Sequence, residues 1–385
     1  MDAEIAVVGL GAMGSMALWR LAQRGVRVDG YERFGIAHDR GASAGQTRRF
    51  SALTQKELRF TPLAIDALHL WRSLQSITGR TLIEQVGGII VGPADAPALT
   101  LAAQSAATTN LAHELVDARD LARRFPQHLI RPTDAGIIEP TGGFVRPELA
   151  VLSAVRQAES LGATVHDHTR VLTVEPDSDG VLVRTDAGTR RYAQAVVAPG
   201  PWAREVLGAT RDLVLPRRLV QAWYAPIDIT LYRADVFPVF ERVGDVKAYG
   251  FPTVDGATVK VGIYTTGHPI VYDLDQPPRT VSLALARYFR DTVATFLPGL
   301  HPDPVTIATG IEGYTTDGLP LLGTLPATPQ VIMACGFSGS GFKFAPVIGD
   351  TIADLAIDGT TERDIDFLSP SRPLAAWPAD HRTLA

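Results

Sequence analysis

The first 32 residues of the chain show the clearest order of apolar runs and turn residues. Ile5 to Val8 form a short apolar run, which predicts a strand, and Ser15 to Arg24 repeat apolar side chains at helical spacing. Val26 to Tyr31 alternate as a second strand, which ends at Glu32. The pattern predicts a strand, a tight turn, a helix and a second strand that ends in an acid. The turn holds the glycines Gly9, Gly11 and Gly14.

This spacing is typical of a βαβ unit that binds a dinucleotide. The first glycines permit the turn and a close approach of the backbone, the third lets the helix pack on the strand, and the acid receives ribose hydroxyls. The helix N-terminus turns its amide groups toward a pyrophosphate. Glu32 disfavours the 2′-phosphate of NADP, and Arg33 softens that exclusion; a turn cluster in an ordinary α/β protein is the alternative. The predicted contacts are Gly9, Gly11, Ala12, Met13, Gly14, Glu32 and Arg33.

The rest of the pattern mixes helices and strands, so the predicted fold class is mixed α/β. A turn is predicted at 142–147, and an apolar strand at 195–198 runs into a turn at 199–202. A Gly-rich loop at 336–343 lies between a strand and a helix. The other predicted helices are 61–74, 148–161 and the stretch up to about 357, and the other predicted strands are 87–91, 164–191 with its hairpin, 219–224, 236–240, 258–264 and 331–334.

Composition narrows the class of protein. The chain has 385 residues, 41 acidic and 36 basic side chains, a formal net charge of −5 and 46% hydrophobic residues. These values exclude a disordered chain and disfavour binding to nucleic acid or anionic lipid through bulk charge. No apolar run of about 18 residues and no leader pattern is present, so we expect a soluble, cytoplasmic protein of two or three domains.

Two residue types stand out by their scarcity. Cys335 is the single cysteine, which excludes an internal disulfide and a multi-cysteine metal site, and the histidines show no metal-ligand spacing. We therefore predict no metal. Of the 36 basic residues only four are lysines, which makes each lysine in a Gly-rich or apolar setting worth attention. They are Lys56, Lys247, Lys260 and Lys343.

Four separated motifs resemble the flavin-dependent amine and amino-acid oxidases of the monomeric sarcosine oxidase type, which are relatives of glycine oxidase and D-amino-acid oxidase. The motifs are the βαβ unit ending at Glu32, the segment 41–48, the pair 249–252 with 259–262, and the loop 336–343. The resemblance implies a Rossmann-like FAD-binding domain and a β-sheet cap domain that binds substrate. The FAD domain would comprise residues 1–85, 140–215 and 305–385, and the cap would comprise 86–139 and 216–304.

The resemblance also implies roles for single residues. Lys260 would promote the reaction with O2, Arg48 would lie near the flavin ring, and Tyr249 would line the substrate side, so these three form the expected catalytic set. Lys343 would bind the substrate carboxylate. Tyr314, like Tyr249, would line the substrate side and donate to the carboxylate or shape the pocket, and a buried core tyrosine is the alternative for each. An outward-facing strand lysine is the alternative for Lys260, and a solvent-facing lysine is the alternative for Lys343. The further expected FAD contacts are Ser43, Thr47, Arg48, Val171, Gly200, Trp202, Gly339, Gly341, Phe342 and Lys343.

The sequence departs from the family at several positions. Ser51 stands where sarcosine oxidases carry a second, carboxylate-binding arginine, and we interpret it as added room for a substrate bulkier than sarcosine. On a regular strand Arg49 would point away from the substrate carboxylate. The second cation that binds this carboxylate must nevertheless be Arg49, a cap residue or another cation. Glu312 replaces the cysteine that bonds FAD, so FAD should be non-covalent. Tyr264 replaces an active-site histidine, and Phe240 with Trp223 would form an apolar chamber.

The resemblance therefore implies an FAD-dependent oxidase of a secondary or N-substituted amino acid, with an N-alkyl glycine as the favoured substrate. Hydride would pass to flavin N5, the imine would hydrolyse, and O2 would become H2O2. The alternatives are a flavin dehydrogenase with another acceptor and a non-catalytic FAD-binding subunit of a heteromeric oxidase. We expect an amino-acid substrate and O2 as partners, no nucleic acid or membrane, and a monomer or small homo-oligomer.

Overall fold

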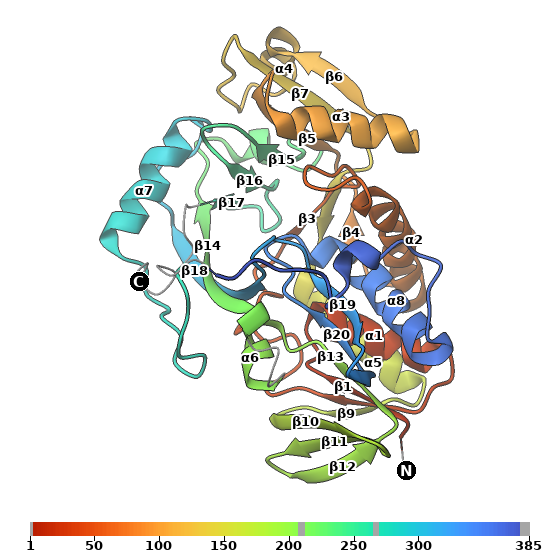
Figure 1. Ribbon diagram of the computed structural model, residues 1–385. Helices are drawn as coiled ribbons and strands as arrows, with labels where there is room; N and C mark the ends of the chain where they lie inside the picture. The colour runs from red at the N-terminus through yellow and green to blue at the C-terminus, as the bar shows by residue number, and fades with distance from the viewer. Residues whose placement is uncertain (1–2, 207–211, 265–268, 378–385) are drawn as a thin grey trace.

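A computed structural model describes residues 3–206, 212–264 and 269–377 (Figure 1). The chain forms two lobes, each built on one large sheet (Figure 1). The residues 1–2, 207–211, 265–268 and 378–385 of the expected domain ranges lie outside this description. Across the described ranges, none of the helices combines the length and apolar character needed to span a bilayer.

The lower lobe contains a six-stranded sheet in the order β19-β20-β13-β1-β2-β9 (Figure 1). All neighbouring pairs run parallel except β19 with β20. The strands come from three separated parts of the chain, so one sheet is assembled from distant segments. Its strands are β1 (Ile5–Val8), β2 (Val28–Tyr31), β9 (Thr164–His166), β13 (Gln194–Val197), β19 (Leu321–Leu325) and β20 (Thr328–Cys335).

Helices supply the apolar core of this lobe. The expected βαβ unit is confirmed, because α1 connects β1 to its parallel neighbour β2. Helix α1 packs against α5 and α8, and the shared core includes Met16, Leu18 and Trp19 (Figure 1). The helices are α1 (Ala12–Gln23), α2 (Phe60–Thr78), α5 (Pro147–Ser160), the short α6 (Ala203–Val206) and α8 (Ala345–Asp358).

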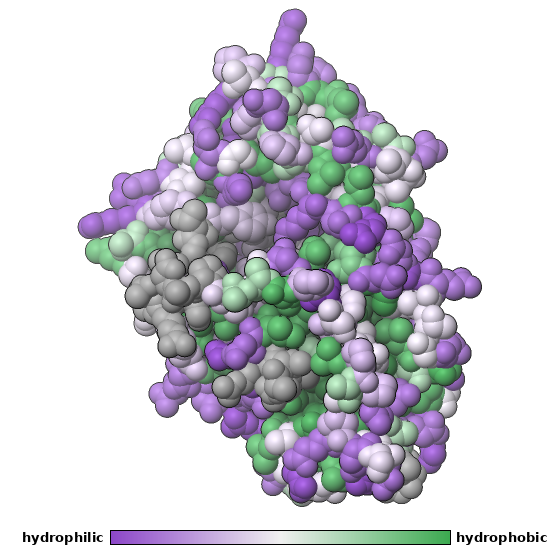
Figure 2. All heavy atoms as spheres, viewed as in Figure 1, coloured by the Kyte–Doolittle hydropathy of each residue, from purple (hydrophilic) through white to green (hydrophobic). Residues whose placement is uncertain are grey.

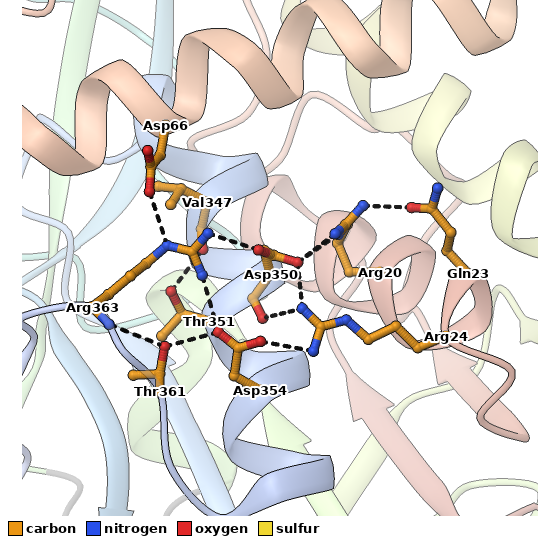
Figure 3. A network of polar contacts seen from close by, with 10 residues as sticks. All are labelled: Arg20, Gln23, Arg24, Asp66, Val347, Asp350, Thr351, Asp354, Thr361 and Arg363. Atoms are coloured by element: carbon orange, nitrogen blue, oxygen red, sulfur yellow. Dashed lines mark hydrogen bonds and ion pairs between the residues drawn. The ribbon is translucent and has the colours of Figure 1, made fainter.

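A cluster of ion pairs ties α1 to α8 and to the chain that follows α8 (Figure 3). The Asp350 carboxylate accepts hydrogen bonds from Arg20 at 2.8 Å, from Arg24 at 2.6 Å and from Arg363 at 2.7 Å. Gly349 permits this close packing, since a Cβ there would lie 2.5 Å from the backbone of Met16. The cluster therefore fixes the orientation of α1, whose N-terminus begins at the glycine turn.

The upper lobe contains an eight-stranded sheet in the order β18-β14-β17-β16-β15-β5-β7-β6 (Figure 1). Strand β18 pairs with β14 over nine residue pairs, from Leu215–Tyr314 to Trp223–Thr306. The stretch that follows residue 305 thus starts in this sheet, which differs from its expected place in the FAD-binding lobe. The strands are β5 (Gly88–Pro93), β6 (Glu114–Asp117), β7 (Asp134–Glu139), β14 (Leu215–Tyr224), β15 (Val239–Arg242), β16 (Ala248–Gly250), β17 (Val259–Ile263) and β18 (Thr306–Tyr314).

Smaller elements complete the two lobes. The stretch 142–147, expected as a turn, contains the strand β8, which pairs with β3 and β4. Only glycine fits at its first position, because Gly143 packs against the Glu84 carbonyl too closely for any side chain. Sheet β3-β8-β4 lies between the lobes (Figure 1), and β3 begins with Arg48 and Arg49. Its strands are β3 (Arg48–Phe50), β4 (Ile83–Glu84) and β8 (Gly143–Val145). A second three-stranded sheet is formed by β10 (Val171–Asp177), β11 (Gly180–Thr185) and β12 (Gly188–Tyr192). The upper-lobe helices are α3 (Pro97–Thr109), α4 (Ala118–Arg124) and α7 (Leu283–Ala294), and the 3₁₀ turns are Gly200–Trp202, Ile229–Tyr232, Phe342–Phe344 and Asp366–Leu368.

Candidate functional site

A cavity of about 1190 Å³ is lined by residues of both lobes. It begins at the glycine turn after β1 and reaches β15 and β16 of the eight-stranded sheet. Figure 2 shows hydrophobic side chains near the middle of the visible face and hydrophilic ones along much of its outline. An elongated cavity of this size, with one end at a helix N-terminus, suits a dinucleotide and leaves space for a small second molecule.

The glycine turn has the close packing that a dinucleotide-binding turn requires. Gly9 has a φ of +86°, and a Cβ there would lie 2.6 Å from the Ala198 carbonyl oxygen. Gly9, Gly11, Ala12 and Met13 line the cavity. Gly14 does not, because a Cβ there would lie 1.8 Å from the Gly9 oxygen, so this glycine serves helix packing.

The acid at the end of β2 lies where a ribose is expected. The Glu32 carboxylate accepts hydrogen bonds from the amides of Leu10 and Phe34, each at 3.0 Å, and lines the cavity. Ser43 Oγ accepts from the Ala12 amide at the start of α1 at 3.1 Å. His38, which the sequence did not single out, lines the same wall with its Nε2 3.3 Å from Glu32. No spacing rule marks His38, because it lies in an irregular loop.

The other expected FAD contacts surround the same cavity. Arg33 stacks over Phe34, 5.2 Å from its ring centre, and over Trp202 at 5.9 Å. These residues therefore provide a polar and aromatic wall of the kind that FAD requires, and they fit this cofactor. The expected contacts that line the cavity here are Arg33, Val171, Gly200, Trp202, Gly339, Gly341, Phe342 and Lys343.

Arg48 lies on β3 and folds back over the loop that precedes it. Its guanidinium donates to the carbonyl oxygens of Ala42 at 2.6 Å and Thr47 at 2.8 Å, and also to that of Ala44. Burial lowers the pKa of Arg48, and the charges of Tyr249, Glu148 and Glu312 oppose that shift. Arg48 lines the cavity, whereas the buried Thr47 does not.

Lys260 lies on β17 with only 3% of its surface exposed, so the outward-facing alternative is wrong. Its Nζ donates to the carbonyl oxygens of Gly45 at 2.6 Å and Thr47 at 2.9 Å. Burial, and then the charge of Arg48, hold its pKa well below the usual value. Lys260 therefore lies directly beneath the 45–47 segment and does not itself line the cavity.

Two residues hold this segment: Glu148, which the sequence analysis missed, and Trp223, whose expected place in the apolar chamber is wrong. The Glu148 carboxylate accepts from the amides of Gly45 at 2.5 Å and Gln46 at 3.1 Å. Trp223 Nε1 donates to the Gln46 side chain at 2.8 Å, so Trp223 braces the segment and does not line the cavity. Glu148 also raises the pKa of Lys260 by its charge, against the larger effect of burial.

The far end of the cavity gathers the expected substrate-side residues. Tyr249, Tyr264, Tyr314 and Lys343 all line it, and the rings of Tyr249 and Tyr264 lie 5.4 Å apart. Lys343 Nζ donates to the Ser51 carbonyl at 3.0 Å. Burial, followed by the charge of Arg49, lowers the pKa of Lys343 to about 8.

Arg49 reaches this end too, although strand alternation suggested that it would point elsewhere. Both Arg48 and Arg49 line the cavity, because Arg48 curls back over its own loop while Arg49 extends to the cap. Arg49 forms an ion pair with Glu241 on β15 at 2.7 Å. Its buried Nε has no hydrogen-bond partner among the described residues.

Two expected substrate contacts lie elsewhere. Phe240 packs in the core of the cap, 4.8 Å from the ring of His128, so the expectation that it forms the substrate chamber is wrong. Because side chains alternate along β15, its neighbour Glu241 faces the cavity instead. The Ser51 hydroxyl donates to Glu139 at 2.5 Å, and Ser51 does not line the cavity, so it does not enlarge the substrate chamber.

Glu312 and Cys335 bear on how a flavin is held. Glu312 lines the cavity, accepts from the Gly339 amide at 2.8 Å, and has its pKa raised by burial. Burial also raises the pKa of the Cys335 thiol to about 12. A thiol with that pKa stays protonated and is a poor nucleophile.

Comparisons with known proteins agree with this geometry. The chain is 35% identical to a monomeric sarcosine oxidase of Streptomyces avermitilis, over 98% of this chain and 99% of that one. It is 29% identical to an N-methyl-L-tryptophan oxidase of Yersinia pestis, over 97% and 100% of the two chains. The solved structure of NikD, an amino acid oxidase essential for nikkomycin biosynthesis, superposes with a TM-score of 0.83 at 25% identity and covers 98% of this chain and 99% of its own.

The family model for FAD-dependent oxidoreductases of the DAO group matches residues 4–355. This span contains the glycine turn, both arginines of β3, the Lys260 strand and the Gly339 loop. The resemblance noted in the sequence, the two-lobed fold and FAD as cofactor are thereby confirmed. The chain belongs to the DAO family of FAD-dependent oxidoreductases.

Proposed function

We propose that this protein is an FAD-dependent oxidase of secondary or N-substituted amino acids that uses O2 and releases H2O2. The observation that carries the proposal is the meeting of Lys343 and Arg49 at the tyrosine-lined end of a dinucleotide-sized cavity. Two cations suit the carboxylate of an amino acid, and the relatives named above act on sarcosine and N-methyl-L-tryptophan. We further propose that the protein works in the cytoplasm as a monomer or small homo-oligomer.

The substrate carboxylate would bind Lys343 Nζ and the unpartnered Nε–H of Arg49. Glu241 holds the Arg49 guanidinium from the other side at 2.7 Å, which fixes its orientation. Arg49 would then replace the arginine that the family carries at the Ser51 position. Tyr249, Tyr264 and Tyr314 would confine the rest of the substrate and exclude water. Bound FAD supplies the two-electron chemistry, and the oxidised substrate, an imine, hydrolyses.

Lys260 and Glu312 support two finer parts of the proposal. A buried ammonium is suited to stabilise the negative charge that develops on O2 as it is reduced, and Lys260 is the buried lysine nearest to the Arg48 segment. Glu312 offers no thiolate at the position where relatives attach the flavin, so we propose non-covalent FAD. We assign residues 1–85, 140–215 and 305–385 to the FAD-binding domain and residues 86–139 and 216–304 to the cap, with β18 shared between them.

A screen for peroxide tests the proposal. Sarcosine, larger N-alkyl glycines, N-methyl L-amino acids, and unsubstituted D- and L-amino acids are incubated with the holoenzyme in air. We expect H2O2 from N-substituted amino acids and little from the corresponding amines that lack a carboxylate. Bleaching of the flavin under nitrogen without oxygen uptake in air would indicate a dehydrogenase instead. No bleaching with any candidate would contradict the enzyme assignment.

A further inference from the structure

The four lysines of the chain gather around one cavity. Lys56, Lys247 and Lys343 line it, and Lys260 lies beneath the 45–47 segment. Elsewhere the chain uses arginine for its basic side chains. An ammonium is a compact charge on a flexible stem, whereas a guanidinium is a planar fork that prefers fixed bidentate partners. The clustering therefore suggests that one further ammonium group contacts a ligand, beyond the two with family roles.

Lys56 is the lysine whose surroundings most resemble an open binding site. It lies in the loop between β3 and α2, is exposed to the cavity, and places its Nζ 3.1 Å from the Ser340 hydroxyl. Among the described residues that hydroxyl is the one hydrogen-bond partner of the Nζ, which forms no ion pair within 4 Å there. Two donors of the ammonium therefore remain available to bind an anion, and burial already lowers the pKa of Lys56.

The position of Lys56 relative to Lys343 is set by a short loop. Lys56 contacts Ser340, and Lys343 follows three residues later in the same Gly-rich loop. The charges of Arg49 and Lys56 both act on Lys343, so the three cations face one space. One ammonium thus lies at each end of the segment 340–343.

The acidic residues nearby are already engaged. Glu241 forms the ion pair with Arg49 at 2.7 Å and accepts from the Gln55 side chain at 2.7 Å. Glu312 accepts from the Gly339 amide and faces the charges of both Arg48 and Lys56. Glu139 accepts from Ser51 and Ala52 and does not line the cavity. Glu312 and Glu241 act on Lys56 through their charges but form no ion pair with it within the described ranges. A substrate with one carboxylate on Lys343 would therefore leave the Lys56 ammonium without a direct anionic partner.

We propose that the preferred substrate is an N-substituted amino acid that carries a second carboxylate, and that Lys56 binds this second group. The inference rests on the proposed function and narrows its substrate class. The first carboxylate would lie on Lys343 and Arg49, and the second would lie between the Lys56 ammonium and the Ser340 hydroxyl. A substrate with a positively charged substituent in place of the second carboxylate is not favoured, because the Glu241 carboxylate is already paired with Arg49.

The test uses two thioether acids that contain no oxidisable amine, thiodiacetate and (methylthio)acetate. They share one carboxylate and differ in the second. Calorimetry on the holoenzyme at about 150 mM salt should show thiodiacetate binding at least about 10-fold more tightly, as expected for one added charge-assisted hydrogen bond. In Lys56→Met the ratio of the two dissociation constants should fall toward one. Lys247→Met removes another lysine that lines the cavity and should keep the ratio.

Substrate turnover provides the second measurement. Iminodiacetate and N-methyl-L-glutamate should exceed sarcosine and N-methyl-L-norvaline in kcat/KM, and Lys56→Met should shrink that advantage. Equal affinities for the two thioether acids, or a ratio lost in Lys247→Met and kept in Lys56→Met, would overturn the inference. Turnover of sarcosine with no preference for a second carboxylate would contradict this inference alone. A holoenzyme that prefers thiodiacetate but oxidises no N-substituted amino acid would contradict the proposed function and with it the substrate assignment.

Discussion

Lys260→Met is expected to slow the reoxidation of the reduced holoenzyme by O2 by about 100-fold or more, since one positioned charge at a developing anion is worth that much. Anaerobic reduction by substrate should change far less. Lys260 is 3% exposed and donates to the Gly45 and Thr47 carbonyls, so its charge is poorly screened by water. Methionine keeps most of the length and the apolar stem of the side chain and removes the charge.

Stopped-flow absorbance separates the two half-reactions. Flavin bleaching after mixing with substrate under nitrogen reports reduction, and the return of the oxidised band after mixing with aerated buffer reports reoxidation. Lys247→Met is the matched control, because Lys247 also lines the cavity but is exposed. Wild-type oxygen reactivity in Lys260→Met would refute the role of this lysine.

Lys343→Met is expected to weaken the binding of (methylthio)acetate by about 10-fold to 100-fold, as for the loss of a charge-assisted hydrogen bond. The pH dependence gives the sharper result. Burial lowers the pKa of Lys343 to about 8, so the side chain is a cation below that pH and neutral above it. In the wild-type protein the affinity should therefore fall as the pH rises through about 8, and bound carboxylate should move the midpoint upward.

Titration calorimetry between about pH 6.5 and pH 9.5 measures this effect. Lys343→Arg is the matched control, because a guanidinium stays charged over the whole range, and its affinity should be nearly independent of pH. Lys343→Met should also lose the pH dependence, at a lower affinity. A wild-type affinity that does not change with pH, or a pH dependence that persists in Lys343→Met, would show that another group binds the carboxylate.

Local patterns predicted the cofactor end of the site well. The unit from Ile5 to Glu32 is contiguous, and the turn, the helix and the strands each leave a signal at fixed spacing. The single-residue placements at the substrate end depend on contacts between distant segments. Glu241 was missed because the phase of a four-residue strand such as β15 cannot be read from alternation alone. The prediction that Phe240 faces the substrate was wrong for the same reason, since Phe240 points into the core of the cap.

Other differences come from long-range pairing. Strand β18 lies beside β14, about 90 residues earlier in the chain, and no local pattern selects that neighbour. Arg49 lines the cavity because its long side chain reaches Glu241 on another lobe, which strand alternation within 48–50 does not reveal. Ser51 turned toward Glu139, a buried acid 88 residues away. For Arg49 and Ser51 the sequence identified the residue but not the distant partner that orients its side chain.

The central claim is that FAD lies in the cavity between the lobes and is held without a covalent bond. The direct measurement is the absorbance spectrum of the purified protein, followed by acid precipitation and quantification of the flavin in the supernatant. We predict a yellow protein that releases about one FAD per chain into the supernatant. A colourless protein that takes up no added FAD would contradict the account, and flavin that stays with the precipitate would contradict the non-covalent link.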